Sequence, residues 1–143
     1  MAESAIPIPR TGERRWRDAI WDWVTTVDHK KIGIMYTLTA LLFFLVGGID
    51  ALLIRLQLAL PENSFLTPQV YNEMFTMHGT TMVFLAIMPF NVGLGNFILP
   101  LMLGANDMAF PRLNALGYWL FLLGGLFLSS SYIVSYTHLT LPT

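Results

Sequence analysis

The residue best suited to chemistry is His78, which stands in the apolar segment FTMHGTTMVF. Imidazole is a good ligand for iron, copper or zinc, and haem iron held by a histidine is a common arrangement. Gly79 beside it has no side chain, which would let a flat macrocycle approach a helix at this point. A histidine that only hydrogen-bonds to a neighbouring helix is the alternative, and residue type alone favours it. A zinc site is disfavoured, because no second histidine follows at helical spacing.

A second group of polar residues surrounds Asp107 in the segment GANDMAFPR. Asn91, Asn96 and Asn114 lie in the apolar segments on either side, where an amide needs a partner or water. The four residues fit the border of a hydrated path. The alternative is an ordinary loop carboxylate with asparagines that hydrogen-bond between helices, and the residues alone favour this alternative.

Asp50 and Arg55 are the third candidate group, at the end of the first apolar segment. They are five residues apart, so they do not face each other closely on an ideal helix. Both side chains can instead reach the membrane–water interface and have no further role. The residues alone do not decide between that interpretation and a functional one.

Three long apolar segments must position these residues. Hydrophobic residues make up 55% of the 143 residues and charged residues 12%, and the mean hydropathy is +0.58. An ordinary soluble domain has roughly 25% charged residues, and about 20 apolar residues cross the hydrocarbon core of a membrane. The sequence therefore predicts an all-α, polytopic membrane protein with three transmembrane helices, over residues 32–54, 74–103 and 113–134. Pro89 is expected to kink the second.

The flanking segments complete the predicted organisation. Residues 1–15 are expected to be flexible, residues 16–31 to form an interfacial amphipathic helix, and residues 135–143 to form a tail. Six of the eight lysines and arginines lie before residue 32, which predicts a cytoplasmic N-terminus. The net charge of −1 gives no support to nucleic-acid binding. The sequence has no cysteine, which excludes disulfides and iron–sulfur clusters.

Five segments resemble the start of subunit I of the haem–copper oxidases: TVDHKKIGIMY, ALLIR, FTMHGTTMVFL, GNFILPLMLGANDMAFPRLNAL and YWLFLLGG. The resemblance is closest to bacterial cytochrome c oxidases that use haem A, and it runs from about Trp21 to Ser131. It implies part of a fold of twelve transmembrane helices in the bacterial plasma membrane. It also implies that the complete complex, with its other subunits, reduces oxygen to water with electrons from cytochrome c and pumps protons.

The resemblance also implies roles for single residues. His78 matches the axial ligand of the low-spin haem iron, and Arg55 matches the arginine that contacts the formyl group of haem A. Asp107 matches the carboxylate at the cytoplasmic mouth of a proton channel, and Asn96 and Asn114 match asparagines that line this mouth. Asn91 has no counterpart in the family pattern.

The electron donor implied by the resemblance is cytochrome c. Quinol-oxidising relatives carry Arg, Asp, His and Gln at a quinone site, and the aligned residues here are Val46, Asp50, Val70 and Glu73. Only Asp50 fits, and valine cannot donate a hydrogen bond to a quinone oxygen. A fragment of a quinol oxidase subunit I is therefore the less favoured alternative.

Several metal ligands of the family do not occur in this sequence. The second low-spin haem ligand, the high-spin haem ligand and the three copper ligands lie on later helices of the family fold. We therefore expect an N-terminal fragment that is inactive by itself. His29 is expected on the wrong side of the membrane for His78, and His138 lies in the tail, where the resemblance has ended and the sequence suggests an artefact. A three-helix membrane protein without a cofactor is the remaining alternative.

Overall fold

A computed structural model describes the backbone of residues 16–139 and the side chains of residues 16–131. Its elements are α1 (Trp16–Val24), α2 (His29–Gln57), α3 (Pro68–Thr80), the π-helix η1 (Thr81–Ile87), α4 (Met88–Leu103) and α5 (Pro111–Leu139). The described residues contain no strand, so the all-α prediction is confirmed. Residues 1–15, which are predicted to be flexible, and the last four residues of the predicted tail lie outside the described residues.

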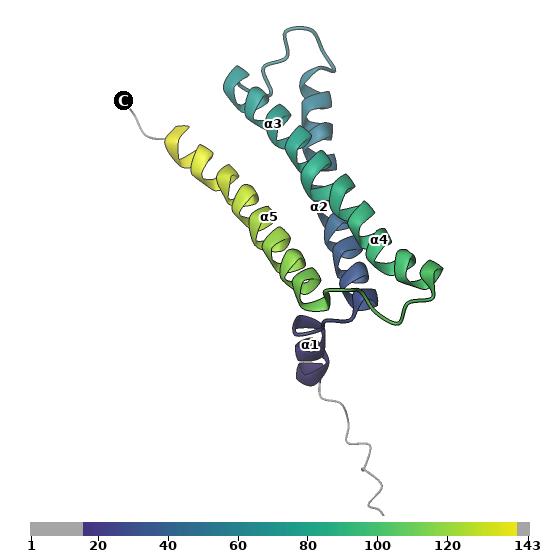
Figure 1. Ribbon diagram of the computed structural model, residues 1–143. Coiled ribbons are helices and arrows are strands. Elements are labelled where there is room, and N and C mark those ends of the chain that lie inside the picture. Colours follow the sequence, from purple (N-terminus) through teal and green to yellow (C-terminus); the bar gives the residue numbers. More distant parts are fainter. Residues whose placement is uncertain (1–15, 140–143) are drawn as a thin grey trace, which may run out of the picture.

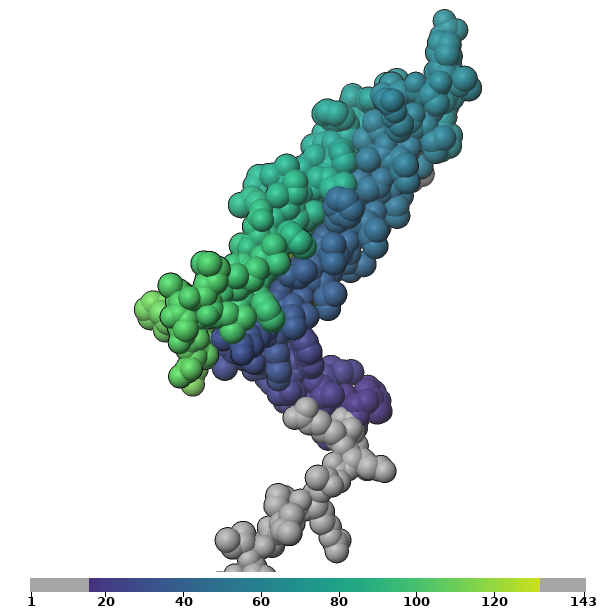
Figure 2. Space-filling view, turned by 90° about the vertical axis from the view of Figure 1, so that its right-hand side faces the viewer, coloured from purple at the N-terminus to yellow at the C-terminus, as the bar shows by residue number. Residues whose placement is uncertain are grey.

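Three helical stretches are long and apolar enough to cross a membrane: His29–Gln57, Pro68–Leu103 and Pro111–Ser131. The second consists of α3, η1 and α4, which form one continuous rod packed along α2 (Figures 1 and 2). α5 lies close to α2 near its own start and leans away from α3 at its far end (Figure 1). The prediction of three membrane-spanning helices is confirmed.

The helix boundaries follow local capping rather than hydrophobicity. The Asp28 side chain accepts the Lys30 backbone N–H at 2.9 Å, and α2 therefore begins at His29. Thr67 caps α3 in the same way and Pro68 follows at the first position, so the rod begins six residues before the predicted residue 74. Gly104, with φ of 67°, ends α4.

The predicted single helix over residues 16–31 is wrong, because the chain is interrupted between α1 and α2. α1 ends at Val24, and the Asp28 cap starts a new helix at His29. Lys31 and Asp22 form an ion pair at 2.8 Å that joins the two helices across this interruption. α1 itself buries no residue and projects from the base of the helix pair (Figures 1 and 2).

α2 and α4 approach closely where two glycines meet. A Cβ added to Gly33 would lie 2.8 Å from the Gly93 carbonyl oxygen, and one added to Gly93 would lie 2.6 Å from the Thr37 Oγ1. Real Cβ atoms do not come this close to other atoms. The absence of both side chains therefore sets the spacing of the helices here, as in other membrane helix pairs.

We expect Gly93→Ala to destabilise the purified protein by about 1–3 kcal/mol, because the added methyl group has no space. Gly95→Ala is the matched control, since a Cβ there would have its nearest neighbour, Leu99 Cδ1, at an ordinary 3.8 Å. Thermal unfolding should show a lower melting temperature for the first variant only. Equal melting temperatures would contradict the close packing at Gly93.

Candidate functional site

His78 lies on α3, within one turn of the start of η1, and is half-buried. Its Nδ1 lies 2.8 Å from the backbone carbonyl oxygen of Gly47 on α2. A carbonyl oxygen only accepts, so Nδ1 carries the proton and donates it, and Nε2 has the lone pair. A hydrogen bond of this kind fixes the tautomer and the orientation of a metal-binding histidine.

The surroundings of His78 are tight on one side and open on the other. A Cβ on Gly47 would lie 3.3 Å from Met82 Cγ, so α2 and the rod are in close contact there. A Cβ on Gly79 would have no neighbour within 4 Å. An oriented imidazole beside an open helix surface fits the edge-on approach of a planar macrocycle. The residues present therefore fit a haem, for which they supply one axial ligand.

Arg55 and Asp50 lie further along α2, beyond Gly47. Arg55 is eight residues past Gly47, which is about 12 Å of helix rise, and its side chain is exposed. Within the described residues, no hydrogen bond or ion pair joins Arg55 to His78. Asp50 is only 6% exposed, so its interpretation as a residue that reaches the membrane interface is wrong.

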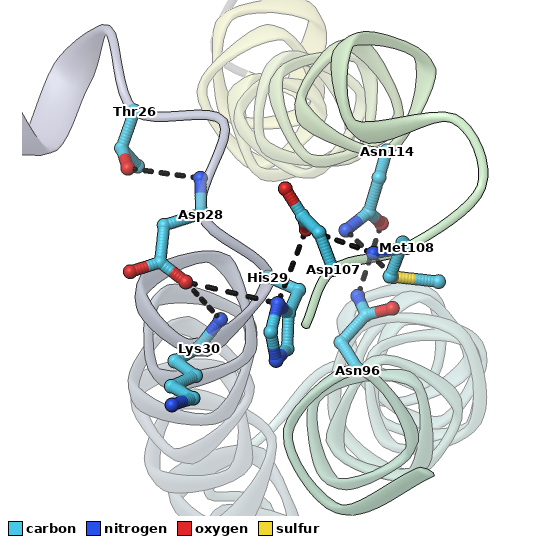
Figure 3. Close-up of polar contacts among 8 residues, drawn as sticks. All are labelled: Thr26, Asp28, His29, Lys30, Asn96, Asp107, Met108 and Asn114. Carbon is cyan, nitrogen blue, oxygen red and sulfur yellow. Dashed lines mark hydrogen bonds and ion pairs between the residues drawn. The ribbon is translucent and has the colours of Figure 1, made fainter. Parts of the chain in front are cut away.

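Asp107 is the centre of a second polar cluster, which lies beside the start of α2 (Figure 3). Its Oδ1 accepts the Met108 backbone N–H at 2.8 Å and lies 3.2 Å from His29 Nδ1. Asn114 Nδ2 lies 3.3 Å from Met108 Sδ, and Asn96 Nδ2 donates to Asn114 Oδ1 at 3.1 Å. The cluster thus leads from an exposed carboxylate to Asn96, which is 6% exposed.

His29 is the member of this cluster that the sequence did not indicate. The residue is 2% exposed, and its Nε2 is buried without a hydrogen-bond partner. Asp28 Oδ1 lies 3.8 Å from Nδ1, so two carboxylates flank the ring. His29 and Asp107 are 78 residues apart in sequence, and no local pattern joins them. That His29 lies on the other side of the membrane from His78 stays a prediction.

The four-residue path predicted around Asp107 is only partly assembled. Asn96, Asn114 and Asp107 come together, whereas Asn91 is exposed and lines a separate groove of about 280 Å³ with apolar residues of α2, η1 and α4. The described residues contain no group of three or more His, Cys, Asp or Glu that could hold a metal ion. A bare metal site is therefore not supported in this part of the chain.

Two polar sites thus lie well apart along α2, one at its start and the other about two thirds of the way along. Gly47 and His29 mark them and are 18 residues apart, about 27 Å of helix rise. Residues 31–141 match the family profile of cytochrome c and quinol oxidase polypeptide I. The chain belongs to this family, the subunit I family of the haem–copper oxidases. The family match continues past Ser131, where the motif resemblance ends.

Relatives in this oxidase family are similar over most of this chain. The chain is 58% identical to cytochrome c oxidase subunit 1 of Bacillus subtilis over 123 residues, which are 85% of this chain and 20% of the relative. It is 56% identical to cytochrome c oxidase subunit 1 of Bacillus sp. PS3 over 115 residues, 80% of this chain and 19% of the relative. It is 48% identical to quinol oxidase subunit 1 of Bacillus subtilis over 130 residues, which are 91% of this chain and 20% of the relative.

The oxidase chain therefore spans about a fifth of the length of these relatives. The family is one of oxidoreductases, and the three apolar helices together with these relatives identify part of a multi-pass bacterial membrane protein. Relatives named for cytochrome c and relatives named for quinol both match, so membership alone does not give the electron donor.

Proposed function

We propose that this chain is the N-terminal part of the catalytic subunit of a cytochrome c oxidase. The complete complex would reduce oxygen to water with electrons from cytochrome c, and it would pump protons across the bacterial plasma membrane. The observation that carries the proposal is the presence of two separate polar sites on one helix unit. One is an oriented imidazole, His78, and the other is the cluster that contains Asp107.

His78 is proposed as an axial ligand of the low-spin haem iron, through Nε2. The Gly47 carbonyl holds the ring by Nδ1, and Gly79 leaves the adjoining helix surface free of a side chain. Arg55 is proposed to donate a hydrogen bond to the formyl oxygen of haem A from its exposed guanidinium. The haem would supply one-electron transfer when bound. The high-spin haem and the copper centre of the family require residues that are not in this sequence.

Asp107 is proposed as the residue that takes up protons on the cytoplasmic side. Its carboxylate is exposed, so it can exchange protons with water, and the Met108 N–H and His29 ring fix its position. Asn114 and Asn96 continue the path inward, where their amides can orient water molecules for proton transfer. The cytoplasmic side follows from the basic residues that precede residue 32.

α1 is proposed to lie in the membrane interface on the same side. Its apolar side chains Trp16, Ile20 and Trp23 recur at helical spacing, and all are exposed. Tryptophan favours the headgroup level of a bilayer. The lipid bilayer and the other oxidase subunits are thus the proposed partners of this segment.

We expect the complete oxidase to oxidise reduced cytochrome c with oxygen uptake, and not to oxidise a quinol directly. Val46 and Val70 offer no hydrogen bond to a quinone, and Asp50 is buried and already has an interaction of its own. The measurement is oxygen consumption by the purified complex with each donor. Rapid oxygen uptake with a quinol alone would favour the quinol oxidase alternative, which a 48% identical relative represents.

A further inference from the structure

The rod that carries both sites is not an α-helix throughout. Between His78 and Asn96 lies the seven-residue π-helix η1, in which the Met88 N–H bonds to the Val83 carbonyl, five residues back. An α-turn closes four residues back, so a π-turn accommodates about one residue more. Thr81, Leu85 and Ala86 of η1 are buried, so this segment is packed in the core of the helix unit.

The extra residue changes the directions in which the two site residues point. His78 and Asn96 are 18 residues apart, which is five complete α-turns of about 3.6 residues. In an uninterrupted α-helix both side chains would therefore face the same neighbour. In the structure His78 bonds to Gly47 of α2, whereas Asn96 bonds to Asn114 of α5.

The contacts of α4 give the size of this rotation. Gly93 and Phe97 of α4 both lie against α2, since the Gly93 carbonyl oxygen and the Phe97 N lie 2.8 and 3.1 Å from the position of a Cβ on Gly33. The face that His78 presents to α2 is therefore continued 15 and 19 residues later, at positions that on an unbroken α-helix would lie about 60° and about 100° around the axis from His78. One residue corresponds to about 100° of helix rotation. η1 accounts for this rotation by accommodating one residue more than an α-helix would.

The sequence offers a local reason for the position of η1. Pro89 lies two residues beyond the last residue of η1 and has no N–H, so the α-helical hydrogen bond to the Leu85 carbonyl cannot form. One α-helical hydrogen bond is therefore missing at Pro89 in any case. This lowers the free-energy cost of a wider turn just before Pro89.

We propose that η1 sets the rotation between the two halves of this membrane helix, so that His78 faces α2 while Asn96 faces α5. The inference rests on the proposed function, since the two directions matter because of the proposed roles of His78 and Asn96. η1 is thus a positioning element for both the haem ligand and the proton path.

The test is the deletion of Phe84 from the complete oxidase. Phe84 lies in η1 and is 59% exposed, so its removal takes away no buried side chain. Without it, 17 residues separate His78 from Asn96, and a plain α-helix then gives the same rotation as the native π-helix. We expect this variant to assemble and to retain the low-spin haem spectrum and proton uptake.

The opposite change is the insertion of one alanine after Phe84, with Phe84→Ala as the control for the side chain. The insertion rotates one half of the rod by about a further 100°, so we expect loss of the low-spin haem signal or of proton uptake. Loss of the low-spin signal on deletion of Phe84, or failure of that variant to assemble, would overturn the proposal. So would an insertion variant that keeps both properties.

The same spectra separate this inference from the proposed function. If His78→Ala abolishes the low-spin signal and deletion of Phe84 abolishes it too, only the role of η1 is wrong. If His78→Ala retains the signal, the haem assignment is wrong, and the proposal for η1 falls with it.

Discussion

Replacing His78 with alanine in the complete oxidase should abolish the low-spin haem signal in optical and electron paramagnetic resonance spectra. Alanine has no lone pair, so one axial position of the iron loses its protein ligand. The side chain is half-buried, and it hydrogen-bonds to the Gly47 carbonyl. The helix unit should therefore still fold, and the change in the spectrum should exceed any change in the amount of assembled protein.

His29→Ala is the matched control for this experiment. It removes the same ring from a more deeply buried place, about 27 Å along α2 from Gly47. We expect it to leave the low-spin haem signal intact. If both variants lose the signal equally, the loss reflects damage to the fold and not the removal of a ligand. A His78→Ala oxidase that keeps its low-spin signal would show that the iron is bound elsewhere.

Replacing Asp107 with asparagine should slow turnover on the order of 10²-fold, the usual effect of removing a positioned proton-transfer group. Asparagine has the same shape and can still accept the Met108 N–H that Asp107 Oδ1 accepts at 2.8 Å. It cannot bind and release a proton near neutral pH. Oxygen consumption and proton uptake by oxidase in vesicles measure the effect.

Asp28→Asn is a closely matched control. The Asp28 and Asp107 side chains are each 47% exposed, and both lie within 4 Å of His29 Nδ1. Asparagine caps a helix as well as aspartate does, so α2 should still begin at His29. We expect turnover of this variant to change little. Turnover in Asp107→Asn equal to that in Asp28→Asn would remove Asp107 from the proton path.

The membrane-spanning helices could be predicted from the sequence because apolar length is a strong signal. Their ends could not be predicted from that signal. The caps at Asp28 and Thr67 lie outside the apolar segments, and they extend α2 and α3 beyond the predicted spans. The division of residues 16–31 into α1 and the start of α2 has the same origin.

The two sites differ in how far the sequence could reveal them. His78 and Asp107 stand out because polar residues are rare in or beside apolar segments. Their partners, the Gly47 carbonyl and His29, do not stand out. A backbone carbonyl has no sequence signal, and a contact between residues that are 78 positions apart depends on how the helices pack.

Asn91 and Asn96 show that spacing along a helix does not by itself predict which residues face the same neighbour. Both stand in the same apolar segment, and the sequence places both on the border of one hydrated path. In the structure Asn96 is buried against Asn114, whereas Asn91 is exposed. The π-helix before them sets which face of α4 turns toward α5. A sequence with one proline at this point does not reveal how many residues the turn before it contains.

An experimental density map of the complete oxidase would show directly whether His78 binds a haem. We expect a haem iron coordinated by Nε2 of His78, with Nδ1 still bonded to the Gly47 carbonyl. We also expect ordered water between Asp107 and Asn96. A haem whose iron is held by other residues, with His78 bonded only to protein groups, would show that His78 is not the ligand.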